Sequence, residues 1–247
     1  MKTLLLDIET APNTAHVWGL WQQNVGIPQL MESSYVLCWA AKWLGEDQVY
    51  FASVQYTQPK EMLEGIHFLL GEADAVIHYN GTKFDIPTLN KEFLLYGMPP
   101  PSPYKQIDLL RVVKSQFRFP SNKLDYVTQR LGMEGKTKHE GHKLWIECMA
   151  NVPSAWEKMK EYNMNDVMIM EGVYHKLKPW IKNHPNHSVF SGKRVCTKCG
   201  SDKYQHRGWS RRVAGSYRRF SCNSCGGWFE ERTVDAKHTT HPFVNSV

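Results

Sequence analysis

The amino-acid sequence predicts an α/β protein in two parts: a ribonuclease H-like mixed sheet flanked by helices, and a small C-terminal metal-binding module. Three observations support this prediction. Short apolar segments alternate with segments of helical periodicity up to about residue 181. Four of the six cysteines form two Cys-x-x-Cys pairs near the C-terminus. A chain of 247 residues can also bury a full domain core and still carry an appendage. We expect domain boundaries of 1–181 for the sheet domain, 182–192 for a polar linker and 193–247 for the module.

The first half of the sheet is predicted to be antiparallel. Residues 1–10 are an apolar run that ends in two acids, as a buried strand does where it leaves the sheet. Residues 34–44 and 48–54 are rich in β-branched and aromatic side chains, and Gly45-Glu46-Asp47 separates them, which predicts a hairpin. Together these segments give three antiparallel strands.

The rest of the first part alternates helices with short strands. Residues 75–79 predict a short buried strand, and a further strand ends at Ile107. Pro87 falls in the first turn of one helix, where its missing N–H does no harm. The predicted helices cover residues 60–70, 86–96, 109–117, 123–131 and 155–177.

Three acidic segments are candidates for a catalytic site. Asp7 and Glu9 lie two positions apart on a strand, so both side chains point to one face. Two such carboxylates repel each other unless a cation lies between them, and a hard divalent ion is the natural occupant. The alternative is that both acids are solvated at a strand end. Asp85 starts a helix, where on its own it is explained as an N-cap.

The third acidic segment lies inside the longest predicted helix. Tyr162 and Asp166 are four residues apart, which places them on one face, a turn apart. The flanking apolar residues favour a position facing a site, although a solvent-exposed Asp166 is the alternative. Asp108 precedes another helix, where capping is favoured over a role beside the site.

In order, the three segments resemble the motifs of the DEDD exonucleases, the proofreading-type 3′-to-5′ nucleases of the ribonuclease H-like (DnaQ-like) superfamily. The matching residues are Asp7-x-Glu9, Asn80-x-x-x-Phe84-Asp85 and Tyr162-x-x-x-Asp166. The last motif resembles the tyrosine (DEDDy) type, because Glu161 stands where the other type has histidine. The resemblance covers roughly residues 1–180, and it is closest to exonucleases found in bacteriophage genomes.

The resemblance implies a two-metal mechanism with two Mg²⁺ or Mn²⁺ ions. It implies that Asp7 bridges both ions, that Glu9 and Asp166 complete the first, and that Asp85 holds the second partly through water. Tyr162 is implied to orient or deprotonate the attacking water. Alternative hypotheses are a ribonuclease H-like nuclease that cuts internally or trims RNA, and a non-enzymatic nucleic-acid-binding protein.

Further residues are candidates for nucleic-acid contacts in the first part. The resemblance implies that Asn80 and the loop holding Trp18 and Trp21 contact terminal nucleotides, although tryptophans are more often simply buried. Five basic residues are expected to form a loop between the second and third motifs, either touching phosphates or simply solvated: Lys136, Lys138, His139, His142 and Lys143.

The cysteine pairs predict a zinc ribbon with one structural Zn²⁺. Cys196 and Cys199 are followed by Gly200, and Cys222 and Cys225 by a second glycine, the spacing of two knuckles that bind a tetrahedral ion. Four thiolates leave no open position for catalysis, and metal binding would fold this small segment. Two disulfides are the alternative, which the absence of a secretory signal disfavours.

The charge distribution predicts that the ribbon binds nucleic acid. From Ser188 onward there are eleven Lys/Arg and four Asp/Glu, or +7, whereas the rest has nineteen and twenty, or −1, giving the total of +6. Basic and aromatic residues alternate between the cysteine pairs, as in nucleic-acid-binding proteins. The candidates for contact are Arg207, Trp209, Arg211, Arg212, Arg218 and Arg219.

Composition also predicts the cellular setting. No apolar run approaches the roughly 20 residues of a membrane span, and the N-terminus lacks the pattern of a signal peptide. We therefore expect a cytoplasmic protein, acting in a host cytoplasm if it is phage-encoded. Its expected partners are nucleic acid, with DNA favoured over RNA, and replication or repair proteins.

Overall fold

The computed structural model describes residues 1–133, 141–212 and 215–231. The chain divides into two compact units, Lys2–Tyr174 and His175–Val247, the latter together with Met1. Within the described ranges, no helix combines the length and apolar character that a membrane span requires.

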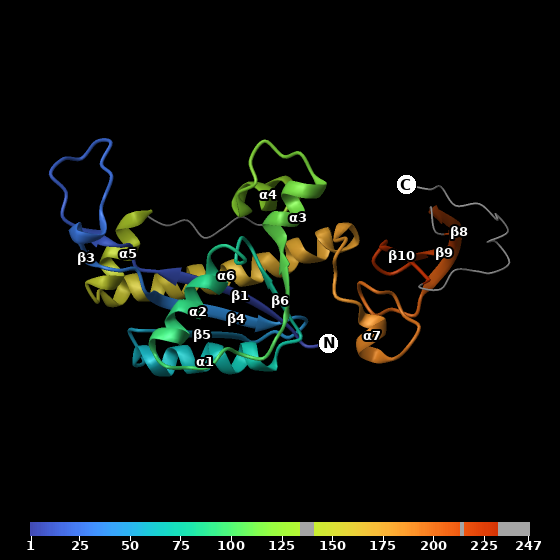
Figure 1. Ribbon diagram of the computed structural model, residues 1–247, viewed down its shortest axis with the longest axis horizontal. Helices are drawn as coiled ribbons and strands as arrows, with labels where there is room; N and C mark the ends of the chain where they lie inside the picture. The colour runs from blue at the N-terminus through green and yellow to red at the C-terminus, as the bar shows by residue number, and fades with distance from the viewer. Residues whose placement is uncertain (134–140, 213–214, 232–247) are drawn as a thin grey trace. The chain divides into compact units, whose positions relative to one another are not determined.

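A five-stranded mixed sheet forms the centre of the unit Lys2–Tyr174 (Figure 1), in the order β5-β4-β1-β6-β7. The middle strand β1 pairs antiparallel with β4 and parallel with β6, and β5 completes the antiparallel half as a hairpin with β4. The strands are β1 (Thr3–Thr10), β4 (Val36–Trp43), β5 (Val49–Ser53), β6 (Ala75–His78) and β7 (Lys105–Asp108). The predicted mixed sheet and its antiparallel start are confirmed.

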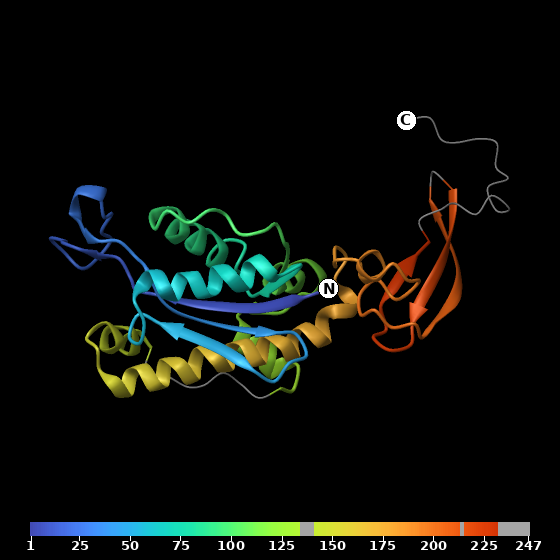
Figure 2. The ribbon, with the colours of Figure 1, turned by 90° about the horizontal axis from the view of Figure 1, so that it is seen from below.

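Helices cover both faces of this sheet, as Figure 2 shows with the sheet seen nearly edge-on. Leu4, Leu6 and Ile8 of β1 pack in a core with α1 and α2, so the alternate residues of β1 face α5 and α6. The helices are α1 (Pro59–Glu72), α2 (Asp85–Leu95), α3 (Leu109–Gln116), α4 (Leu124–Arg130), α5 (His142–Met149) and α6 (Pro153–Leu177). Asp7 and Glu9 therefore belong to the α5/α6 face.

Two segments differ from the predictions. The short strands β2 (Thr14–Ala15) and β3 (Leu30–Glu32), with the 3-10 turn η1 (Ile27–Gln29), form an arm between β1 and β4 (Figure 1). Trp18 and Trp21 on this arm are almost fully exposed, so the interpretation that they are buried is wrong. His142 and Lys143 begin helix α5, so they are not part of a loop.

The remaining members of the predicted basic loop, Lys136, Lys138 and His139, lie outside the described residues.

The C-terminal unit contains the small sheet β10-β9-β8. Its elements are η2 (Lys178–Trp180), α7 (His187–Ser191), β8 (Tyr204–Arg212), β9 (Gly215–Cys222) and β10 (Trp228–Glu230). Helix α7 falls within the segment expected to be a linker. The rings of Tyr204, Phe220 and Phe229 pack together with centroids 5.3–5.6 Å apart. This aromatic cluster is too small to supply a full domain core.

A buried ion pair joins α6 to the sheet. The Lys42 ammonium of β4 pairs with the Glu171 carboxylate of α6, and both side chains are largely buried, at 8% and 16% exposure. Glu171 also accepts a hydrogen bond of 2.9 Å from the Gly45 backbone N–H. A buried pair of this kind is costly to break, because the remaining charge is left without compensation.

We predict that Glu171→Gln lowers the free energy of unfolding by about 3 kcal/mol, since the variant leaves the Lys42 ammonium buried without a counter-charge. Urea unfolding followed by far-UV circular dichroism measures this. The control is Glu64→Gln, which removes the exposed pair with Lys60 and is expected to cost less than about 0.5 kcal/mol. Equal losses for the two variants would contradict the role given to the buried pair.

Candidate functional site

Asp7 and Glu9 lie at the carboxyl end of β1, and each accepts a hydrogen bond from a helix on the same face. The Asn163 Nδ2 of α6 donates to Asp7 Oδ2 at 2.7 Å. The Trp145 Nε1 of α5 donates to Glu9 Oε2 at 3.2 Å. Both acids are half-buried, so their solvation is incomplete. The interpretation that they are merely solvated at a strand end does not fit these contacts.

The third motif brings Tyr162 and Asp166 to the same place. Both side chains are buried, and Tyr162 makes a side-chain hydrogen bond with Asp166. Burial raises the pKa of the Tyr162 phenol, and the nearby charges of Asp166, Glu9 and Asp7 raise it further. Tyr162 is therefore close to three carboxylates, and its hydroxyl stays protonated at neutral pH. The interpretation of Asp166 as a solvent-exposed acid is wrong.

Asp85 joins this group through β1. Its Oδ1 accepts a hydrogen bond of 3.2 Å from the Ile8 backbone N–H, at the strand position between Asp7 and Glu9. Helix α2 begins at Asp85 and Phe84 takes the N-cap position, so the interpretation of Asp85 as an N-cap is wrong. Burial raises the pKa of Asp85 to about 7, although hydrogen bonds from the Ile8 and Asp85 backbones oppose the shift.

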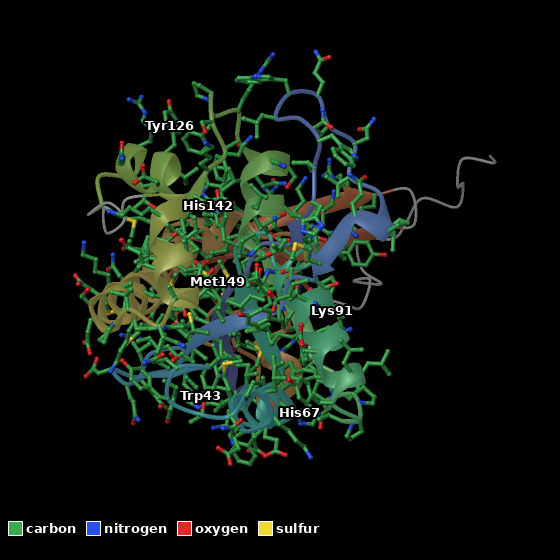
Figure 3. All side chains as sticks on the ribbon, turned by 90° about the vertical axis from the view of Figure 1, so that its left-hand side faces the viewer. Trp43, His67, Lys91, Tyr126, His142 and Met149 are labelled. Carbon is green, nitrogen blue, oxygen red and sulfur yellow. The ribbon has the colours of Figure 1, made fainter. Side chains whose placement is uncertain are left out.

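We call Asp7, Glu9, Asp85 and Asp166 the carboxylate site. Figure 3 looks toward the carboxyl end of β1, with α5, marked by His142 and Met149, on one side and α2, marked by Lys91, on the other. The donors are hard oxygen atoms, which suit Mg²⁺ or Mn²⁺. Burial raises the pKa of Asp85 and so disfavours its ionised form, which a nearby divalent cation would favour. The residues present therefore fit a divalent metal site.

Asn80 lies between β6 and α2 and has an unusual backbone conformation. Its φ of 75° is in the left-handed region, and its backbone N–H donates to Asp108 Oδ1 at 3.0 Å. Asp108 also accepts from the backbone N–H groups of Leu110 and Arg111, so its predicted role as a helix cap is confirmed. Asn80 borders a pocket of about 550 Å³, whose lining includes Tyr79, Lys114, Asn122 and Lys123.

The sequence analysis missed Asn163, Trp145 and Cys38. Asn163 lies within the third motif and also accepts a weak hydrogen bond from the Cys38 thiol, at 3.8 Å from Sγ to Oδ1. Trp145 contacts Tyr162 edge-on, with ring centroids 6.0 Å apart. Asn163 could have been found because it adjoins Tyr162. Trp145 carried no such signal, since its helix α5 was not predicted.

The four cysteines form a separate candidate metal centre in the C-terminal unit. Their sulfur atoms all lie within 4.8 Å of one another, with Cys196–Cys225 at 3.7 Å and Cys199–Cys222 at 3.6 Å. These distances are longer than the roughly 2 Å of a disulfide, so the disulfide alternative is wrong. A soft, tetrahedral thiolate set of this kind fits Zn²⁺.

The two halves of this centre have matching backbone geometry. Gly200 and Gly226 each follow a cysteine pair with φ of +74°. Their backbone N–H groups donate to the Cys196 and Cys222 carbonyls at 2.9 and 3.0 Å. The predicted knuckles are therefore present. Among the described residues, only these cysteines form a group of three or more metal-ligand side chains packed this closely. The ligand oxygen atoms of the carboxylate site are therefore spaced more widely than the four sulfur atoms.

Comparison with known proteins places this site in a family. The sequence profile described as RNase_H superfamily (RNase_H_2) matches residues 4–178, which cover all three acidic motifs. The chain belongs to the RNase H superfamily. Membership supports a nuclease. Nucleases of this superfamily generally use divalent metals, which is consistent with the oxygen donors of the carboxylate site.

A solved structure with the same fold is the family B DNA polymerase from the hyperthermophilic archaeon Pyrobaculum calidifontis. The TM-score is 0.57 at 19% sequence identity, and the alignment covers 72% of this RNase H superfamily chain. It covers 24% of the polymerase, so the chain corresponds to about a quarter of that protein. No curated protein matches the sequence.

We predict that Asp85→Asn stabilises the protein at about pH 8 in buffer without Mg²⁺ or Mn²⁺. The unfolded chain releases the Asp85 proton near its ordinary pKa of 3.8 and the folded chain near 7. Folding is therefore penalised progressively between those values, by about 1.4 kcal/mol per pH unit at most. Thermal unfolding should show a gain of about 1–4 kcal/mol over wild type at about pH 8 and none at about pH 4.

Adding Mg²⁺ is expected to reverse this order at about pH 8, because the metal stabilises only the wild-type carboxylate. If the stability of wild type and variant had the same pH dependence, Asp85 would be ionised in the folded protein at little cost, and the prediction would be contradicted.

Proposed function

We propose that this protein is a metal-dependent 3′-to-5′ exonuclease of the tyrosine (DEDDy) type, resembling those found in bacteriophage genomes, and that it acts in the cytoplasm with DNA favoured over RNA. One observation carries the proposal. Carboxylates from β1, α2 and α6 converge at the end of β1, and the Tyr162 hydroxyl lies among three of them. Membership in the RNase H superfamily supports a nuclease, and the ordered motifs favour cleavage from a 3′ end.

Each residue has a distinct role in this proposal. Asp7 would be shared by two divalent ions, which Glu9, Asp166 and Asp85 would also hold. When bound, such ions activate water and stabilise the leaving 3′ oxygen. The Tyr162 hydroxyl, hydrogen-bonded to Asp166, is suited to orienting the attacking water.

Two neighbours hold the carboxylates in position. Asn163 fixes Asp7 through its amide N–H, and its oxygen is in turn held by the Cys38 thiol. Trp145 fixes Glu9 and packs against the Tyr162 ring. These contacts orient the acids before any ion or substrate binds.

The ribbon, residues 193–247, is proposed to hold the nucleic acid that the exonuclease domain, residues 1–181, degrades. Its cysteines bind one Zn²⁺, which stabilises the β8–β10 sheet. Its arginines and aromatic side chains supply the contacts, as the charge excess of this segment favours. Replication or repair proteins are the proposed protein partners.

A single strand labelled at its 5′ end tests the activity. We expect Mg²⁺-dependent, stepwise loss from the 3′ end, more rapid on DNA than on RNA of the same sequence. Asp7→Asn should reduce the rate by about 10³-fold or more, because it removes the bridging carboxylate. Asp47→Asn, in the exposed β4–β5 turn, is the matched control and should not change the rate.

Internal cuts would instead support the alternative of a ribonuclease H-like nuclease that cleaves within the strand. The absence of any metal-dependent loss would support a binding protein without catalysis.

The role of Tyr162 is tested by Tyr162→Phe, which keeps the ring contact with Trp145 and removes only the hydroxyl. We expect kcat to fall by about 10²-fold with little change in KM, because orientation of the attacking water contributes to the transition state rather than to substrate binding. Tyr50→Phe on β5, whose ring packs against the α1/α2 core, is the control. An unchanged kcat would limit Tyr162 to packing.

A further inference from the structure

The two faces of the ribbon sheet differ in what covers them. Residues directly opposite on antiparallel strands share a face, so the register assigns each side chain. Phe220 of β9 lies opposite Phe229 of β10, and with Tyr204 of β8 it forms the aromatic cluster. This face borders a pocket of about 430 Å³ that Arg194 and Glu231 also line. We call it the packed face.

The other face carries aromatic rings with arginines stacked on them, and we call it the open face. The Arg219 guanidinium lies 4.9 Å from the centroid of the Trp228 ring, and Trp228 is 50% exposed. The Arg212 guanidinium lies 5.4 Å from the Tyr217 ring. The register places Trp228 opposite Ser221 and Tyr217 opposite Ser210. Small neighbours therefore leave both rings accessible from the side.

Charge compensation also differs between the faces. On the packed face, Arg194 and Arg218 both pair with Glu231, at 2.9 and 3.9 Å. On the open face, Arg212 pairs with Glu230. Glu230 lies directly opposite Arg219 in the register, yet among the described residues no carboxylate lies within ion-pair distance of the Arg219 guanidinium, which donates to the Arg207 carbonyl. The open face thus carries two arginines, Arg212 and Arg219, against one carboxylate, Glu230, next to an exposed ring.

We infer that the open face binds single-stranded nucleic acid, with a base stacked on Trp228 and a neighbouring phosphate on Arg219. An unpaired base offers its ring face to the indole, whereas a duplex hides its ring faces inside the stack. An arginine beside the ring can contact a phosphate while the ring holds the base. This inference rests on the proposed function of the ribbon. It assigns the main base contact to Trp228 instead of Trp209, which lies on the packed face under Arg218.

The test compares the two tryptophans in the full chain with Asp7→Asn present, so that the strand survives. Fluorescence anisotropy with a short 5′-labelled oligo(dT) measures the dissociation constant. We expect Trp228→Ala to raise Kd by about tenfold, the effect of losing one base–aromatic stack, and Trp228→Phe to raise it much less. Trp209→Ala, which also removes an indole next to an arginine, should raise Kd by less than Trp228→Ala does.

A second variant tests the phosphate contact without removing the ring. Arg219→Gln should reduce the slope of log Kd against log salt concentration by about 0.7, the contribution of one phosphate on a single strand. Circular dichroism and zinc content establish that each variant is folded. If Trp228→Ala does not fold, the decision rests on Trp228→Phe and Arg219→Gln.

The outcomes separate this inference from the proposed function. Three results would overturn the open-face assignment. Trp209→Ala could raise Kd as much as Trp228→Ala does or more, or Kd could be unchanged by the variants at both Trp228 and Arg219. The third is a larger effect of Trp228→Ala on the Kd of a hairpin duplex than on that of the single strand. Trimming of oligo(dT) by the protein with Asp7 intact, measured in parallel, reports on the exonuclease alone. Trimming together with a Kd insensitive to every ribbon variant would leave the exonuclease in place and make the ribbon a docking module for a protein.

Discussion

Electrostatic repulsion among the carboxylates at the end of β1 is the constraint on which the rest of the first unit depends. Asp7 and Glu9 share a face of the central strand, and Asp85 is bonded to the backbone between them. Neutral donors on α5 and α6 partly offset this repulsion. Burial, together with the charge of Asp108, raises the pKa of Asp85 and so disfavours its ionised form. A divalent cation held by these carboxylates would favour their ionised forms and offset the cost of placing them close together.

The sheet and α6 give this site its rigidity. The Asn163 amide joins α6 to Asp7, and two turns further along the same helix Glu171 pairs with Lys42 of β4. These two contacts hold one face of α6 against the sheet at separate points, so Tyr162 and Asp166 are presented at fixed positions. The C-terminal unit is stabilised differently. It has a small aromatic cluster and four clustered thiols, and a metal held by those thiols would substitute for the core that it lacks.

Much of the fold could be predicted from sequence, because the apolar strands and the periodic helices each carry a strong local pattern. The carboxylate motifs and cysteine pairs could be predicted because their chemistry restricts both residue type and spacing. Trp145 could not, since its hydrogen bond to Glu9 joins residues far apart in the chain. The exposure of Trp18 was one of two alternatives but not the favoured one, because an apolar side chain is normally expected to be buried. The role of Asp85 was ambiguous for a related reason: an acid at a helix start fits a cap as well as a ligand, and only the contact with Ile8 distinguishes them.

The most direct test of the account is Mn²⁺ binding, followed by electron paramagnetic resonance on the intact protein with its zinc site filled. Mn²⁺ prefers oxygen donors, so it reports on the carboxylates and not on the thiolates. The account predicts that wild type binds Mn²⁺, that binding strengthens as pH rises toward about 7 while Asp85 loses its proton, and that Asp7→Asn largely abolishes it. Mn²⁺ binding that is absent, or that is unchanged by Asp7→Asn, would contradict the assignment of the carboxylates as a metal site.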